Sequence, residues 1–334
     1  MKRIFIYTIG FAFFTIIACS RNNDNFGIDV EIPDFDFPKT ITFEQNLSAY
    51  NIFADTIANL IPSDDFHLLE LSSVLFTDYA HKQRLAKVPE GAQMIRLNDG
   101  SIDFPDGTIL VKTFYYYADE RDTSLGKRII ESRLLIKESG VWNVATYLWN
   151  QVQDEAVLTL NGTDTQVNWV TAEGDSRSTL YHVPDENECI ACHQSNENMI
   201  PLGTVLRNLN RNVERNGTNL NQINHLQSVG VLNDFQVSQV SNIVDYNDSS
   251  ISLTERGRAY LAMNCAHCHN PTAWDEPAGK DFDFRYELAL SQTGISFEKD
   301  KIIEVVQDRE MPFIGTTTLD VEGVQLVVNF IENL

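Results

Sequence analysis

Two short segments of the sequence carry the residues best suited to chemistry. Residues 189–193 read CIACH and residues 265–269 read CAHCH, so both share the pattern C-x-x-C-H. This is the attachment pattern of c-type haem. Two thiols at this spacing can each form a thioether to one vinyl group of the porphyrin, and the adjoining histidine then faces the iron. The sequence therefore predicts two covalent c-type haems, bound by Cys189, Cys192, His193, Cys265, Cys268 and His269.

Other uses of four cysteines explain this pattern less well, although they stay open as alternatives. A four-cysteine zinc site would join the two C-x-x-C pairs, but the interval between them is far longer than in a zinc ribbon. A pair of disulfides is compatible with an exported protein. A thioredoxin-like redox pair would follow a strand in a βαβ unit, and the sequence contains no such unit. The zinc and disulfide interpretations also leave the two trailing histidines unexplained.

The second motif lies in an informative context. Gly257 precedes it on a predicted helix, Met311-Pro312 follows it, and Phe330 lies on an amphipathic terminal helix. This arrangement resembles the class I cytochrome c domain. The resemblance implies that Gly257 allows its helix to pack closely on Phe330, and that Met311 is the sixth ligand of the iron. A His/Met-ligated iron has a raised potential and is suited to relaying electrons. The alternative role for Met311 is that of a core methionine.

The first motif has less context. It follows a predicted strand at Ser178–Val183, and Tyr181 stands where the second motif has its helical glycine. The sequence does not single out a sixth ligand for this iron. An iron with no protein ligand on that side could bind peroxide or another small oxidant. The candidate sixth ligands are Met199, His225, His182, His81 and His67.

The elements that must position these motifs are strand-like up to about residue 178 and helix-like after it. Residues 107–117, 128–137 and 141–149 are β-branched and aromatic, with Gly, Asn and Asp turns between them. Such runs are typical of antiparallel strands. Later, residues 202–213 and 237–244 are helix candidates, and a capping box at Ser252 begins a helix that ends near Asn264.

These patterns predict an α+β fold class. An N-terminal β-rich domain, an antiparallel meander or sandwich over residues 46–178, is followed by mainly α-helical c-type haem domains. Residues 179–250 form the first haem segment and residues 251–334 the cytochrome c-like second haem domain.

The N-terminus has the features of an export signal. Met1-Lys2-Arg3 is followed by about 15 apolar residues, which is too short to span a membrane. The run that ends at Cys19 resembles the bacterial lipobox. The prediction is a lipoprotein signal peptide over residues 1–18, lipidation at Cys19, and an acidic spacer over residues 19–45. The protein would then be an exported lipoprotein anchored to a membrane of the bacterial cell envelope, on its periplasmic side or at the outer surface.

Composition restricts the partners. The chain has 25 Lys and Arg against 47 Asp and Glu, a formal net charge of −22, which excludes binding to a nucleic-acid backbone.

With both motifs placed, residues 45–334 resemble a family of exported di-haem c-type cytochromes of unassigned role. The resemblance lies in the residues around 75–84, 104–108, 131–135, 142–149 and 258–271.

The predicted function is single-electron transfer between redox partners. Because the surface is acidic, it would favour a partner with a basic surface. Two alternatives remain. One is a di-haem enzyme, a peroxidase or small-molecule oxidase, with the first haem catalytic. The other is a haem subunit that docks on a larger dehydrogenase or oxidase through its β-rich half.

Overall fold

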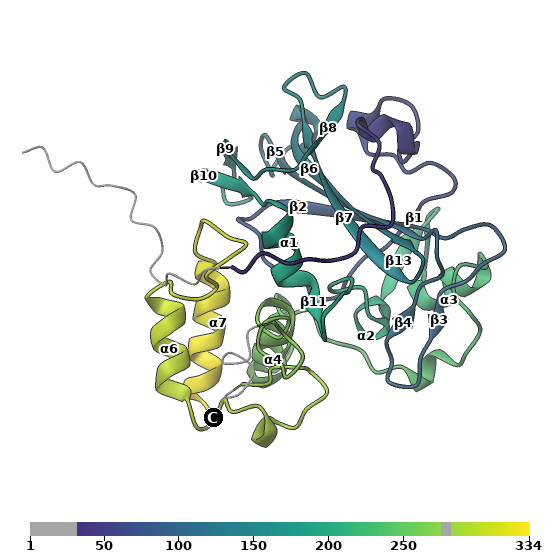
Figure 1. Cartoon of the computed structure of the whole chain (residues 1–334). Coiled ribbons are helices and arrows are strands. Elements are labelled where there is room, and N and C mark those ends of the chain that lie inside the picture. Colours follow the sequence, from purple (N-terminus) through teal and green to yellow (C-terminus); the bar gives the residue numbers. More distant parts are fainter. Residues whose placement is uncertain (1–31, 275–281) are drawn as a thin grey trace, which may run out of the picture.

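The computed structural model describes residues 32–274 and 282–334, and its largest element is a six-stranded antiparallel sheet (Figure 1). Each strand pairs antiparallel with its neighbour. The strand order is β1 (His67–Leu68), β2 (His81–Lys87), β5 (Ile109–Tyr117), β6 (Lys127–Glu138), β7 (Val141–Trp149) and β8 (Ala156–Thr159).

Alternation along the strands gives the sheet two different faces. Side chains of directly paired residues lie on the same face, and the next residue along each strand lies on the other. One row, Leu85, Val111, Leu134 and Ala145, is buried in a cluster with residues of the 47–66 segment. The adjacent row, Ala86, Leu110, Leu135 and Val144, packs on the opposite face with Cys189 of the first motif. The second face therefore supports the first motif.

Four two-stranded ladders surround this sheet. Asn216 and Gly217 both have positive φ, at 52° and 75°, and they join the last ladder, as expected for an Asn-Gly hairpin turn. The ladders are β3 (Ile95–Arg96) with β4 (Ile102–Asp103), β9 (Thr163–Val170) with β10 (Ser176–Val183), β11 (Gln194–Ser195) with β12 (Asn198–Met199), and β13 (Asn212–Arg215) with β14 (Thr218–Asn221).

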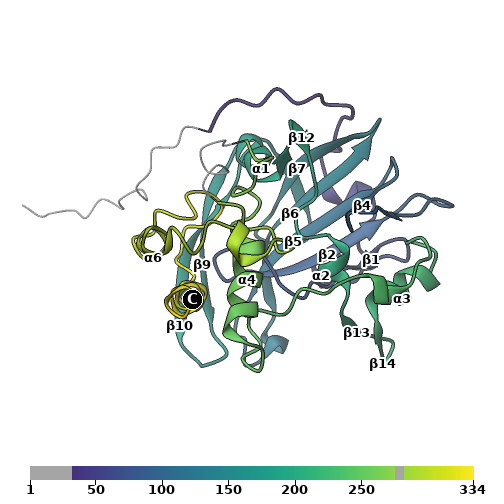
Figure 2. The same ribbon diagram turned by 90° about the horizontal axis from the view of Figure 1, so that it is seen from below.

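The helices are few and mostly short. Those of the described residues are α1 (Glu186–His193), α2 (Leu206–Leu209), α3 (Gln222–Ser228), α4 (Leu253–Asn264), α6 (Lys299–Gln307) and α7 (Val321–Glu332). Short 3₁₀ turns occur at Leu47–Tyr50, Ile57–Asn59, Thr123–Leu125, Val237–Gln239 and Leu290–Gln292. In both views α6 and α7 lie on one side of the molecule, with α4 between them and the six-stranded sheet (Figure 2).

The predicted fold class is wrong in its second part. Over residues 32–274 and 282–334 the structure is β-rich and only 23% helical, and this part of the chain contains no mainly α-helical haem domain. Residues 202–213 form a single helical turn, α2, and then enter strand β13, while residues 237–244 contain only a 3₁₀ turn. Gly203, with φ of 77°, interrupts the apolar pattern that resembles a helix. The Asn-Gly turn at residues 216 and 217 then pairs the following residues as β13 and β14. Even after residue 251, the helices α4, α6 and α7 are separated by long irregular segments.

The start of the described chain is extended and lies against the body. Phe35 and Phe37 pack on the hydrophobic cluster that contains Cys189, and Lys39 forms an ion pair with Glu186 of α1. This stretch is the second part of the predicted acidic spacer. The predicted signal peptide, residues 1–18, and the lipidation site Cys19 lie outside the described residues. Within residues 32–274 and 282–334, no helix has the length and apolar character needed to cross a membrane.

Candidate haem site

Helix α1 presents the first motif from its last turn. The helix begins with a reciprocal capping box: the Asp185 carboxylate accepts from the backbone N–H of Glu188 at 2.9 Å, and the Glu188 carboxylate accepts from that of Asp185 at 2.8 Å. His182 contacts the same Glu188 carboxylate at 2.9 Å, so the preceding strand β10 holds this end of the helix. Cys189 is buried in the hydrophobic cluster that packs on the sheet.

Helix α4 presents the second motif directly after its last residue. The chain continues through one more turn, in which the backbone N–H of His269 donates to the Cys265 carbonyl at 2.9 Å. Buried Asn270 closes the turn, because its side-chain N–H donates to the Ala266 carbonyl at 2.8 Å and its oxygen accepts from Thr272. Both motifs therefore sit at the end of a helical segment.

The chain segments that follow the two motifs are hydrogen-bonded to each other. The backbone N–H of Asn196 donates to the Thr272 carbonyl at 2.8 Å, and the hydroxyls of Ser195 and Thr272 lie 2.7 Å apart. This link fixes the position of one motif relative to the other, although they are far apart in the sequence.

All six motif residues line one cavity of about 620 Å³, and Met311 lies on the same wall. This volume is within the range typical of cofactor sites. Met311 is held at the end of α6 by its backbone N–H, which donates to the Val305 carbonyl at 3.1 Å. The structure thus brings together the six motif residues and Met311, the sixth ligand that the sequence predicts for the second haem.

His193 is prepared to act as a ligand. Its Nδ1 lies 2.8 Å from the Ile200 carbonyl oxygen, which can only accept, so Nδ1 carries the proton and Nε2 presents its lone pair. Desolvation lowers the pKa of His193 to about 3, which keeps the imidazole neutral. His269 is oriented by aromatic neighbours, with its ring centroid 5.7 Å from that of Phe282 and 5.3 Å from that of Phe284.

The thiols have the properties of inert structural groups. Burial raises the pKa of Cys189 and Cys265 to about 12 and that of Cys192 to about 11. A thioredoxin-like pair depends on a lowered thiol pKa, so that alternative is not supported. The four motif cysteines form no disulfide with one another.

The donor geometry also bears on the zinc alternative. In residues 32–274 and 282–334, no three Cys, His, Asp or Glu side chains are grouped as a direct metal site requires. A haem iron needs no such group, because the porphyrin supplies four of its ligands.

Unsatisfied polar atoms on the wall fit a bound group with polar edges. The Trp274 indole N–H and the Gln194 side-chain oxygen are buried and have no hydrogen-bond partner in the described structure. Trp274 is held between Phe35 and Phe313, at ring-centroid distances of 6.0 and 6.3 Å. The Trp274 N–H could donate to a carboxylate, such as haem carries, whereas the Gln194 oxygen needs a donor that a carboxylate does not supply.

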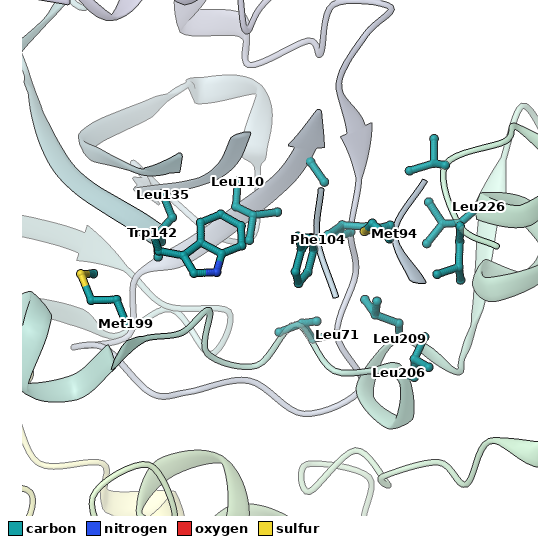
Figure 3. Close-up of a cluster of buried hydrophobic side chains, with 14 of the residues drawn as sticks. Leu71, Met94, Phe104, Leu110, Leu135, Trp142, Met199, Leu206, Leu209 and Leu226 are labelled. Atoms are coloured by element: carbon teal, nitrogen blue, oxygen red, sulfur yellow. The ribbon is translucent and has the colours of Figure 1, made fainter. Parts of the chain in front are cut away.

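The candidates for a sixth ligand of the first haem are not on this wall. Met199 is buried in the core against Trp142 and Leu135 (Figure 3). His67, His81, His182 and His225 also do not line the cavity. The sequence analysis missed two ligand-type side chains that do line it, Met263 and His267. Nothing in their spacing distinguishes them from ordinary residues beside a motif.

The wall is also more basic than the protein. Five of its described side chains are cationic and three are acidic, namely Arg84, Lys112, Arg133, Arg285 and Arg309 against Glu188, Glu287 and Asp320. Local sequence patterns did not indicate these cations, because three of them come from strands of the β-rich half.

No family model, curated protein or solved structure matches this chain.

Proposed function

We propose that this protein is a di-haem c-type cytochrome that transfers single electrons between redox partners. The observation that carries the proposal is that both C-x-x-C-H motifs line one cavity and are hydrogen-bonded through the segments that follow them. A c-type haem at each motif supplies an iron that cycles between ferrous and ferric states. His193 and His269 would be the proximal ligands, and Met311 the sixth ligand of the second iron.

The chain's own residues have clear tasks in this proposal. The Ile200 carbonyl fixes the tautomer and orientation of the His193 imidazole, and Phe282 and Phe284 orient that of His269. Two thiols would fix each porphyrin covalently, and both porphyrins would be attached at the wall of one cavity.

The direct test is to produce the protein with a haem-maturation system and measure its mass and spectrum. We expect a mass increment of two haems and, after reduction, the α-band of c-type haem. A colourless protein with four titratable thiols, or one that contains zinc, would refute the proposal.

Met311 and Met199 form a matched pair of methionines for a second test. We expect Met311→Leu to abolish Met ligation at one iron and lower its midpoint potential, because a thioether ligand raises the potential. Met199→Leu should leave both haem spectra unchanged, since Met199 packs in the core. Electronic and EPR spectra with a potentiometric titration check this. A spectral change in Met199→Leu alone would reverse the assignment.

An enzymatic role is favoured by one observation. None of the sixth-ligand candidates considered for the first haem lies on the cavity wall. A first iron open to peroxide or another small oxidant would be high-spin in the ferric protein, whereas a relay would have two low-spin haems. If both are low-spin, Met263 and His267 are the ligand-type side chains on the wall to replace.

The partner is proposed to be a redox protein with a basic docking face, because the chain carries a net charge of −22. A dehydrogenase or oxidase that docks on the β-rich half is one such partner. Electron-transfer rates that fall with added salt would support a basic partner. We further propose that the protein is an exported lipoprotein, anchored at Cys19 to a membrane of the cell envelope.

A further inference from the structure

Three cations form a row across the centre of the large sheet. Arg84 on β2 pairs directly with Lys112 on β5, and Lys112 pairs with Arg133 on β6. All three lie on the face of the sheet that lines the cavity. Like charges directly opposite one another destabilise a sheet. A negative charge on the cavity side would therefore stabilise this cation row, which consists of Arg84, Lys112 and Arg133.

Only one member of the cation row has its own carboxylate. Arg133 forms an ion pair with buried Glu131, at 2.5 Å, and Glu131 also accepts from the Tyr181 hydroxyl at 2.6 Å. Across the described residues, Arg84 and Lys112 form no ion pair, and the Lys112 ammonium lies 4.8 Å from the centre of the Phe114 ring. Burial lowers the pKa of Arg84 to about 10 and that of Lys112 well below its usual value. Two basic side chains thus lie in a desolvated wall, and neither forms an ion pair within the described residues.

The cation row lies beside the first motif. Thr146 on β7 pairs with Arg133 and so extends the row by one strand, and β7 is the strand of the large sheet that contacts α1, the helix of Cys189. A haem attached to the cysteines of this motif through its vinyl groups would carry its propionates on the opposite edge of the porphyrin. The row runs from Thr146 through Arg133 to Lys112 and Arg84, which lie at its other end.

We propose that Arg84 and Lys112 bind the two carboxylates of the porphyrin attached at Cys189 and Cys192. The inference rests on the proposed function, because it requires a haem at the first motif. Haem carries two propionate groups, and the row offers two uncompensated cations. The Arg84 guanidinium matches a carboxylate with two parallel donors, and the Lys112 ammonium supplies a compact second charge. The β-rich half thus contributes directly to cofactor binding.

The test compares Arg84→Gln, Lys112→Gln and the double variant with Lys87→Gln. Lys87 lies on the same strand β2 as Arg84, but it pairs with exposed Asp65 and does not line the cavity. Mass gives the haem content, a potentiometric titration the midpoint potential of each haem, and resonance Raman the propionate bending bands. We expect two haems in every variant. In the cavity variants we expect shifted propionate bands and a lower potential at the first haem only, since removing positive charge disfavours the ferrous state. Lys87→Gln should match the wild type.

The propionate bands decide the outcome. If they are unchanged in the double variant, the proposal is overturned, whatever happens to the potential. Binding of acetate to the wild type that is lost in these variants, with unchanged bands, would assign the row to a free carboxylate instead. Should Arg84→Gln fail to fold, Arg84→Lys retains the charge and should give smaller shifts in the same direction. A wild-type protein without haem refutes the proposed function itself, which separates the two failures.

Discussion

Replacing both Cys189 and Cys192 with alanine is expected to remove one of two haems and leave the other attached. Each thioether forms at its own cysteine, so the loss of one pair should not prevent attachment at Cys265 and Cys268. The mass should fall by one haem, and the α-band absorbance should decrease by about half. The alanine pair leaves His193 in place, so any residual binding at the first motif would be noncovalent and lost on denaturation.

The reciprocal variant, Cys265→Ala with Cys268→Ala, is the matched control. It should remove the other haem, and the spectra of the two single-haem proteins should add up to that of the wild type. Because Asn196 and Ser195 bond Thr272, we expect each remaining haem to shift modestly in potential when its neighbour is absent. Retention of two haems in either variant would contradict the assignment of the motifs.

Local sequence patterns predicted those elements whose structure depends only on residues close together in the sequence. The alternating runs at residues 107–117, 128–137 and 141–149 correspond to strands β5, β6 and β7, and the capping signal at Ser252 marks the start of α4. In these segments, periodicity and capping favour the same structure, and the final packing agrees with them. The C-x-x-C-H motifs were found for the same reason, because their chemistry depends on spacing within five residues.

The site as a whole could not be read from local patterns. Its wall joins Arg84, Lys112, the two motifs and Met311, which meet only when the sheet, α1 and α4 pack together. One signal for it was present in the sequence. Lys112 stands between Leu110 and Phe114 at the inward phase of a strand, and a charge at such a position needs a partner or a ligand. The fold class was misjudged because the helix pattern of residues 202–213 is interrupted by turn residues whose effect depends on tertiary pairing.

Substituting Gly257 with alanine is expected to destabilise the protein by about 3 kcal/mol, although alanine is the better helix former. The predicted close approach of Gly257 and Phe330 is confirmed: a Cβ at Gly257 would lie 2.3 Å from Cγ of Phe330. Alanine in place of glycine favours a helix by about 1 kcal/mol. The clash is larger, because Phe330 is buried and its ring cannot move without separating α4 from α7.

Denaturant unfolding of the holoprotein measures this effect, with Thr254→Ala as the control. Thr254 is exposed on the same helix α4, so its replacement should change stability by less than about 0.5 kcal/mol. The spectrum of the second haem should also change, because α4 leads directly into the second motif and Met311 lines the same cavity. The control should show neither change.

A double-mutant cycle with Phe330→Ala separates the clash from any general weakness of α4. Removing the ring leaves a cavity and costs about 3 to 5 kcal/mol alone. The space that it vacates is where the new methyl group must lie, so the two substitutions together should cost clearly less than the sum of their separate effects. Simple additivity would mean that the glycine is not required by the ring, and that the α4–α7 packing does not position the second motif in the way the class I resemblance implies.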